Sequence, residues 1–243
     1  MPTVLILGAT SEMAMAVAKK FGSEKYNIQL AARNIEQIKS LQSDISIRYN
    51  VTCTSHSFDA AAFSTHKTFF SQLFPKPDVT VCVFGYLGEN EKAISQWMET
   101  ETIIQTNYTG AVSILNIVAA SYMIFKKGTI VGISSVAGER GRQSNFMYGS
   151  AKAGFTAYLS GLRNRLFREG VHVVTVLPGF VYTRMTEELN LPKLLTANPD
   201  EVGIAVYNAV LKKKNIIYVR WFWRWIMLII KLIPEPVFKK LKL

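Results

Sequence analysis

Cysteine and histidine are scarce in this sequence. Its 243 residues include two cysteines and three histidines. Cys53 and Cys82 each lie within an apolar run that is typical of a strand, so we expect two buried free thiols instead of a disulfide or a metal pair. His56, His66 and His172 do not have the spacing of metal ligands. The sequence therefore indicates neither a disulfide framework nor a metal site.

The N-terminal stretch also lacks the pattern of a targeting segment. MPTVLILGAT is apolar, but it has no basic leader and no cleavage site, so it is typical of a strand and not of a signal peptide. No internal repeat, low-complexity tract or domain linker follows it. With 49% hydrophobic and 19% charged residues, the chain has the composition of a single globular domain. We expect a cytoplasmic protein in a reducing environment.

Acidic residues are few in the last part of the chain. The net charge is +11, and from Lys212 onward nine basic residues face one acidic residue, Glu235, so this part carries +8 of the total. The rest of the chain is close to balanced, which argues against a nucleic-acid-binding domain. The excess charge is local and calls for a local partner.

Short apolar, β-branched stretches alternate with helix-like stretches along most of the chain. This alternation is typical of a parallel sheet covered on both faces. It predicts an α/β protein with a Rossmann, doubly wound parallel sheet of about seven strands with helices on both faces. We assign residues 1–219 to this domain and residues 220–243 to a C-terminal amphipathic helical tail. The strand-like stretches are 3–7, 27–32, 51–58, 78–85, 128–135, 171–179 and 215–219.

The segment LILGATSEMAMAVA joins the first predicted strand to the first predicted helix. Gly8 allows a sharp turn, and Thr10 and Ser11 offer hydroxyls and amides to a pyrophosphate at the helix N-terminus. The glycine-rich fingerprint of dinucleotide sites is only partly present, because Glu12 and Ala14 stand where glycine is common. An ordinary turn between a strand and a helix is the alternative interpretation of this segment.

Ser135, Tyr148 and Lys152 form the strongest chemical pattern. Tyr148 and Lys152 are four residues apart on a predicted helix and therefore share one face. Ser135 ends a predicted strand, where ligands of such sheets bind. We expect the Lys152 ammonium, together with a nicotinamide ring, to lower the pKa of Tyr148 so that the phenol acts as an acid on a carbonyl substrate. The alternative is an exposed tyrosine and lysine on a helix without chemical function.

These residues resemble the short-chain dehydrogenase/reductase family over about residues 3–219. The resemblance rests on Gly8, the spacing of 13 between Ser135 and Tyr148, the Tyr148-x-x-x-Lys152 pair and PGFVYT at 178–183. It implies a Rossmann fold, a nicotinamide cofactor that also contacts Tyr148 and Lys152, and a proton relay from Tyr148 through Lys152 to Asn107. Within PGFVYT, it implies cofactor contacts for Pro178, Gly179 and Thr183.

One segment departs from the family pattern. The family often has Asn-Asn-Ala-Gly after the fourth strand, whereas this sequence reads CVFGYLGEN and keeps only Gly85. This departure leaves the local backbone contacts to the adenosine side of the cofactor open.

The end of the second predicted strand, LAARN, bears on the choice of cofactor. An acid at Ala32 would bind the ribose hydroxyls of NAD, but the position holds no acid and Arg33 follows it. A guanidinium can bind a 2′-phosphate, so we favour NADP(H), with NAD(H) as the alternative if Arg33 is only solvated. By the family resemblance, Asp59 lies beside the adenine ring.

The tail segment WFWRWIMLIIKLI at 221–233 is amphipathic. Its 13 positions are too few to span a bilayer, and Pro234 and Pro236 interrupt the run. On a helical wheel Arg220, Arg224 and Lys231 form a narrow stripe, so we expect the helix to lie at a membrane surface. Packing on its own domain and a dimer interface are the alternatives.

Four short segments carry a narrower resemblance. FGYLGENE, PGFVYTRMT, NPDEV and LIPEPVFKKL are similar to the reductases of decaprenylphosphoryl-ribose 2′-epimerisation. The resemblance implies that a flavin oxidase partner makes a 2-keto sugar on a polyprenyl phosphate and that this chain reduces it at the inner face of the membrane. Arg184 would assist with the lipid phosphate, and the family resemblance implies a homo-oligomer.

Two other functions stay open. One is reduction of another lipid-borne ketone, such as a steroid or a long-chain acyl carbonyl. The other is a cofactor-binding scaffold without turnover, which recruits a partner through its tail. No nucleic-acid partner is expected.

Overall fold

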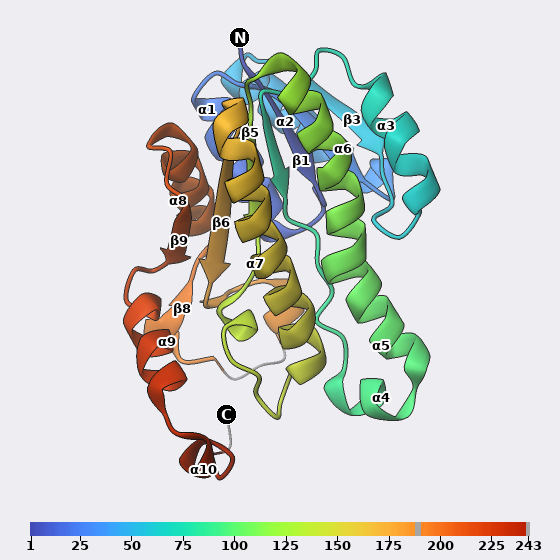
Figure 1. The fold of residues 1–243 in the computed structure, drawn as a ribbon. Helices are drawn as coiled ribbons and strands as arrows, with labels where there is room; N and C mark the ends of the chain where they lie inside the picture. Colours follow the sequence, from blue (N-terminus) through green and yellow to red (C-terminus); the bar gives the residue numbers. More distant parts are fainter. Residues whose placement is uncertain (188–190, 242–243) are drawn as a thin grey trace.

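Seven parallel strands form the centre of the molecule (Figure 1). A computed structural model describes residues 1–187 and 191–241. The strand order β3-β2-β1-β4-β5-β6-β9 reverses between β1 and β4, which is where open sheets of this kind bind ligands. The predicted Rossmann-type sheet is confirmed. Its strands are β1 (Thr3–Leu7), β2 (Asn27–Ala32), β3 (Cys53–Ser57), β4 (Val79–Cys82), β5 (Thr129–Ile133), β6 (His172–Pro178) and β9 (Ile216–Val219).

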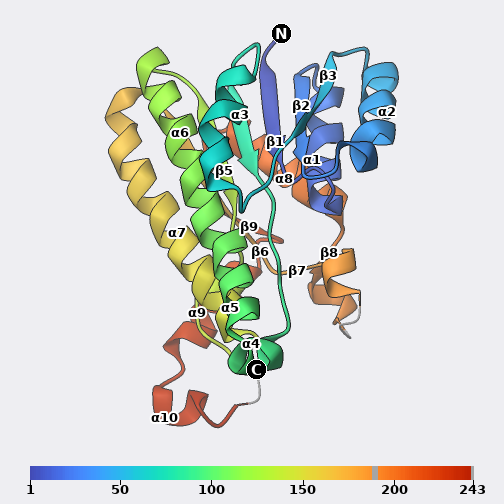
Figure 2. The same ribbon diagram turned by 90° about the vertical axis from the view of Figure 1, so that its right-hand side faces the viewer.

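Helices cover both faces of the sheet, as Figure 2 shows. Side chains alternate along β1, so that Val4 and Ile6 belong to one core and Leu5 and Leu7 to the other. The first core is closed by α1 (Glu12–Ser23), α2 (Lys39–Tyr49) and α8 (Pro199–Leu211). The second core is closed by α3 (His66–Gln72), α6 (Gly110–Phe125) and α7 (Phe146–Leu166).

One continuous helical run, Trp97–Phe125, is apolar and long enough to cross a membrane by length and composition. It comprises α5 (Trp97–Ile104), a π-helical turn η3 (Gln105–Thr109) and α6, and it follows α4 (Asn90–Ser95). In this structure α6 packs on the sheet through the buried side chains of Ile114, Leu115 and Val118. The run therefore has the contacts of a core helix.

The remaining short elements surround the carboxyl ends of the strands or link the helices. β7 (Phe180–Val181) and β8 (Thr196–Ala197) pair as a two-stranded parallel sheet next to the main one. The 3₁₀ turns are η1 (Ile35–Ile38), η2 (Phe63–Thr65), η4 (Val136–Gly138), η5 (Phe167–Glu169), η6 (Arg184–Thr186) and η7 (Lys193–Leu195).

The C-terminal tail packs on the domain through one face. It contains α9 (Trp223–Leu232) and α10 (Glu235–Phe238), at the end of the sheet toward which the strands point (Figure 1). Trp223 and Met227 are buried against Val136 and Leu177, while the opposite face of α9 is exposed. Residues 242 and 243, which end the predicted tail, lie outside the described residues.

Two of the three cations in the predicted tail stripe bind acids of the domain. Arg220 pairs with Glu201 at 3.0 Å, and Lys231 pairs with Glu139 at 2.7 Å. The helical wheel could not indicate these pairs, because both acids lie on distant elements. Arg224 is exposed, so the cationic stripe expected to face lipid is reduced to this residue.

Candidate active site

A cavity of about 580 Å³ lies at the carboxyl ends of β5 and β6. The loop after β5, the first turn of α7 and the loop after β6 form most of its wall, and Met13 reaches it from the first turn of α1. Predicted site residues in its lining are Ser135, Tyr148, Pro178, Gly179 and Thr183. The fold therefore brings together residues that are up to 48 positions apart in the sequence.

Ser135 and Tyr148 lie on one wall of this cavity. Ser135 follows β5 and caps η4, where its hydroxyl accepts a hydrogen bond from the Ala137 amide at 3.1 Å. Burial raises the pKa of Tyr148 to about 12, and the nearby Ser135 hydroxyl offsets part of this rise. For the protein's own residues, desolvation of the phenolate therefore outweighs their stabilising effect. The lowering expected from Lys152 together with a nicotinamide ring stays a prediction.

Lys152 lies one helical turn after Tyr148, and its side chain is buried. Its Nζ atom donates a hydrogen bond to the Ile133 carbonyl at 3.0 Å and lies 5.7 Å from the centre of the Tyr148 ring. Burial lowers the pKa of Lys152 to about 8. The ammonium is thus held close to the Tyr148 ring, and it gives up its proton more readily than a surface lysine does.

Asn107 occupies the π-helical turn between α5 and α6. Its amide nitrogen donates to the Tyr86 carbonyl at 2.6 Å and the Ile103 carbonyl at 2.9 Å, and its oxygen accepts from the Tyr86 amide at 3.2 Å. π-Helical turns often occur at functional sites. This turn directs a buried asparagine toward the loop after β4, which contains Gly85 and Tyr86.

Gly85 separates Asn107 from Lys152. A Cβ atom at this position would lie 3.0 Å from the Asn107 side-chain oxygen and 3.5 Å from Lys152 Nζ. Although this segment departs from the family pattern, it keeps glycine at position 85, where Asn107 and Lys152 approach the backbone closely. The relay from Tyr148 through Lys152 to Asn107 stays a prediction, with its last two members on either side of Gly85.

The turn after β1 has the shape of a phosphate cradle. Gly8 has φ +91°, and a Cβ atom there would lie 2.7 Å from Phe84. Ser11 caps α1 by accepting a hydrogen bond from the Ala14 amide at 3.2 Å. Only glycine permits this turn, which brings the backbone close to the N-terminus of α1. The residues present therefore fit a dinucleotide pyrophosphate.

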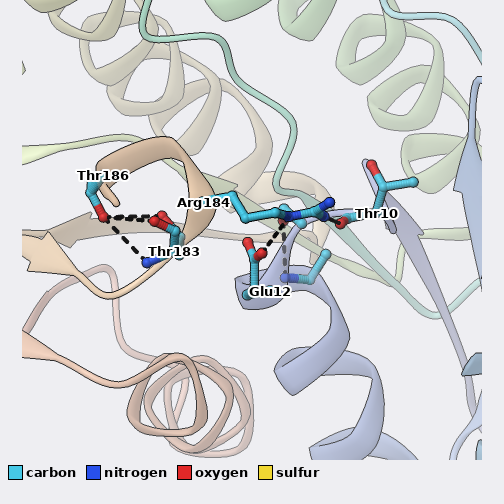
Figure 3. Close-up of polar contacts among 7 residues, drawn as sticks. Thr10, Glu12, Thr183, Arg184 and Thr186 are labelled. Atoms are coloured by element: carbon cyan, nitrogen blue, oxygen red, sulfur yellow. Dashed lines mark hydrogen bonds and ion pairs between the residues drawn. The ribbon is translucent and has the colours of Figure 1, made fainter. Parts of the chain in front are cut away.

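An ion pair that the sequence did not indicate crosses this turn (Figure 3). Arg184 Nε binds the Glu12 carboxylate at 2.6 Å, and Arg184 Nη2 donates to the Thr10 carbonyl at 2.8 Å. Glu12 thus points toward the loop after β6. Arg184, expected to assist with a lipid phosphate, instead contacts the phosphate turn.

The two residues predicted near the adenosine side follow neighbouring strands. Arg33 is exposed directly after β2. Asp59 lies beyond β3, where its carboxylate accepts a hydrogen bond from the Ala61 amide at 3.0 Å. Asp59 borders a separate cavity of about 640 Å³ along the β3 edge. We place the active site in the cavity with Ser135 and Tyr148, because the chemical groups lie there.

Several residues at the site were not predicted, among them Arg142, Asn145 and Trp223. Arg142 and Asn145 line the cavity from the loop between Ser135 and Tyr148, and Trp223 of the tail touches the loop after β6. A Cβ atom at Gly179 would lie 2.0 Å from the Trp223 ring, and Trp223 Nε1 donates to the Leu195 carbonyl at 3.1 Å. The polar run GERGRQSN was the available signal for the first two.

Comparison with known proteins gives relatives over the whole chain. The family model described as short chain dehydrogenase matches residues 2–193. An uncharacterized oxidoreductase of Mycobacterium tuberculosis is 30% identical over 241 residues, which are 98% of this chain and 96% of that protein. An uncharacterized oxidoreductase of Streptomyces coelicolor is 29% identical over 242 residues, covering 98% and 95%.

Solved structures with the same fold are more distant in sequence. A short-chain dehydrogenase from Sphingobium yanoikuyae in complex with NADPH has a TM-score of 0.83 at 20% identity and covers 97% of each chain. An actinorhodin polyketide ketoreductase with NADPH has a TM-score of 0.80 at 20% identity, covering 91% of this chain and 96% of that one. At this identity the likeness establishes the fold.

Proposed function

This chain belongs to the short-chain dehydrogenase family, and on that premise we propose that it reduces the 2-keto sugar of a polyprenyl-phosphate pentose with NADPH at a membrane surface. The reaction is the second step of an epimerisation, after an oxidase has made the ketone. The observation that carries the proposal is the shared cavity of Ser135 and Tyr148, with the Lys152 ammonium buried beside it.

The chain's own residues suit NADPH. Gly8, Thr10 and Ser11 would hold the pyrophosphate at the N-terminus of α1, and the exposed Arg33 would pair with the 2′-phosphate. Solved structures of the same fold are described with NADPH, which supports this choice over NAD(H). The residues proposed for the adenine and nicotinamide ends are Asp59, Gly85, Pro178, Gly179 and Thr183.

The protein would supply the proton and the orientation. When bound, NADPH supplies the hydride that reduces the carbonyl carbon to an alcohol. Ser135 would donate a hydrogen bond to the carbonyl oxygen, and the Tyr148 phenol would transfer its proton to that oxygen. The Lys152 ammonium would stabilise the resulting phenolate. Asn107 would complete the relay through Lys152 by which Tyr148 regains a proton after the reaction.

The exposed face of the tail supports action at a membrane. It presents large apolar side chains next to Arg224, and the exposed Lys239 and Lys240 follow α10. At ten residues, α9 is about 15 Å long, too short to cross a bilayer core. Because Trp223 contacts the loop at Gly179, the same tail would hold the cavity next to the lipid. The exposed apolar residues are Trp221, Trp225, Leu228, Ile229 and Leu232.

Two partners complete the proposal. A flavin oxidase that converts the 2-hydroxyl of the lipid-linked pentose to a ketone would supply the substrate. Two copies of this chain would pair through α7, the helix that carries Tyr148. The protein would act in the cytoplasm, peripheral on the inner face of the membrane.

A reconstituted assay tests the function. Anionic vesicles carrying a polyprenyl-phosphoryl 2-keto pentose are incubated with the protein and NADPH, and the sugar product is identified by chromatography. We expect consumption of NADPH matched by formation of the arabinose epimer. Reduction of a steroid or 3-ketoacyl substrate without reduction of the keto sugar would instead support the other lipid ketone. Tight NADPH binding without any turnover would support a scaffold.

A further inference from the structure

Two buried polar atoms in the wall of the active-site cavity have no hydrogen-bond partner within residues 1–187 and 191–241. They are Nε of Arg142 and the side-chain oxygen of Asn145. Both residues border the cavity that contains Ser135 and Tyr148. Buried polar atoms are nearly always paired, so an unpaired donor and acceptor in one cavity indicate a ligand that pairs with them.

The charge of Arg142 is also uncompensated in the described part of the chain. In that part of the chain its Nη2 atom lies 3.3 Å from the sulfur of Met227, and a thioether is a weak hydrogen-bond acceptor. Among the described acids on the neighbouring elements, Glu139 binds Lys231 and the Tyr218 hydroxyl through Oε1, and Glu235 binds Arg140. The other oxygen of Glu139, Oε2, is buried without a partner but does not contact Arg142 within hydrogen-bond distance. A half-buried guanidinium without a carboxylate favours an oxyanion from outside the protein.

The segment that carries Arg142 is firmly held. Two residues earlier, Arg140 donates hydrogen bonds to the carbonyls of Ile230 at 2.6 Å and Ile233 at 2.7 Å, which closes the end of α9. Asn145 directly precedes α7, three residues before Tyr148. Asn145 is therefore held within one helical turn of Tyr148, and Arg142 is held in the short loop before it.

We propose that Arg142 and Asn145 form a substrate subsite in which the guanidinium binds the phosphate of a glycosyl phosphate and the Asn145 amide binds a sugar hydroxyl. The subsite rests on the proposed function, and it names the residues that would select a phosphate-bearing ketone over a neutral one. Arg142 is a specificity residue here, since the proton transfer is assigned to Tyr148.

Binding of a substrate-like pair tests the subsite without turnover. Farnesyl-phosphoryl arabinose and the phosphate-free farnesyl arabinoside are titrated into the protein by calorimetry, with and without NADP⁺. We expect the wild type to bind the phosphate compound more tightly. Arg142→Met should weaken that binding by about 10- to 100-fold and leave the neutral compound within about threefold. Arg142→Lys, which keeps the charge, should recover most of the loss.

The matched control is Arg165→Met, which removes an exposed arginine further along α7 and should behave as the wild type. An equal loss of both ligands in Arg142→Met would assign Arg142 a structural role and overturn the subsite. Unchanged binding of the phosphate compound would overturn it as well. If the keto sugar is not reduced while the Arg142-dependent preference for phosphate persists, the proposed reaction fails and the subsite stands.

Discussion

Arg184 binds the carboxylate of Glu12 at 2.6 Å across 172 positions of the sequence. The same guanidinium binds the Thr10 carbonyl, so the loop after β6 is tied to the turn proposed to hold the cofactor phosphates (Figure 3). The Arg184 side chain is 70% exposed, and exposed ion pairs contribute only about 0–1 kcal/mol to stability. We therefore expect the pair to matter for the loop and the cofactor more than for folding.

Replacing Arg184 by Met should change cofactor kinetics with little effect on stability. The free energy of unfolding should fall by less than about 1 kcal/mol, while NADPH should dissociate several-fold faster because the loop is no longer tied to the turn. Stopped-flow fluorescence measures the dissociation rate. Lys20→Met breaks the exposed pair with Glu24 on α1 and serves as control. Equal dissociation rates in the two variants would show that the Arg184 contact does not retain cofactor.

Lys152 should make stability depend on pH in the alkaline range. Its folded pKa of about 8 lies below the ordinary value of 10.5, so between these values the unfolded chain binds more protons and the contribution of Lys152 to stability rises with pH. Lys152→Met should therefore stabilise the protein at pH 7 by about 1–3 kcal/mol and much less at pH 10. Urea unfolding at both pH values measures this difference. A stabilisation that is the same at both would contradict the lowered pKa.

Arg33 should set the preference between cofactors. Arg33→Asp should lower the ratio of kcat/KM for NADPH to that for NADH by about tenfold or more, since it replaces a phosphate-binding cation with a carboxylate. Lys19→Asp makes the same charge change at an exposed position of α1. The prediction fails if both variants keep the wild-type ratio.

The exposed face of α9 should bind lipid. The triple variant Trp225→Gln, Ile229→Gln and Leu232→Gln should lower partitioning onto anionic vesicles by about tenfold or more, because it removes exposed apolar area. Circular dichroism and turnover of a soluble ketone should stay near wild type. Ile124→Gln changes an exposed apolar residue on α6 and should bind as the wild type. If the triple variant sediments with the vesicles as fully as the wild type, the exposed face of α9 does not bind the membrane.

Local patterns were enough to predict the sheet and some of the residues that line the candidate site. The β-branched runs indicated seven strands, and the spacing of Ser135, Tyr148 and Lys152 predicted that they would meet. The contacts that join distant segments could not be predicted in this way. Glu12 and Arg184 lie far apart in the sequence, and the pairing of Lys231 with Glu139 depends on where α9 docks.

Electrostatics was the second limit. We expected the ammonium four residues after Tyr148, together with a nicotinamide ring, to lower the pKa of the phenol. For the protein's own residues the sign of the shift depends on how deeply the fold buries both groups. Burial raises the pKa of the phenol and lowers that of Lys152. A sequence gives the charges and their spacing, whereas desolvation is a property of the packed structure.

Turnover by Tyr148→Phe tests the role of the phenol most directly. The substitution removes one hydroxyl and keeps the ring that packs in the cavity wall. Ketone reduction should fall by about 10²- to 10⁴-fold, the usual contribution of a general acid, while the Kd for NADPH, measured by fluorescence titration, stays within about threefold of wild type. Reduction at a rate within tenfold of wild type would show that Tyr148 is not the proton donor.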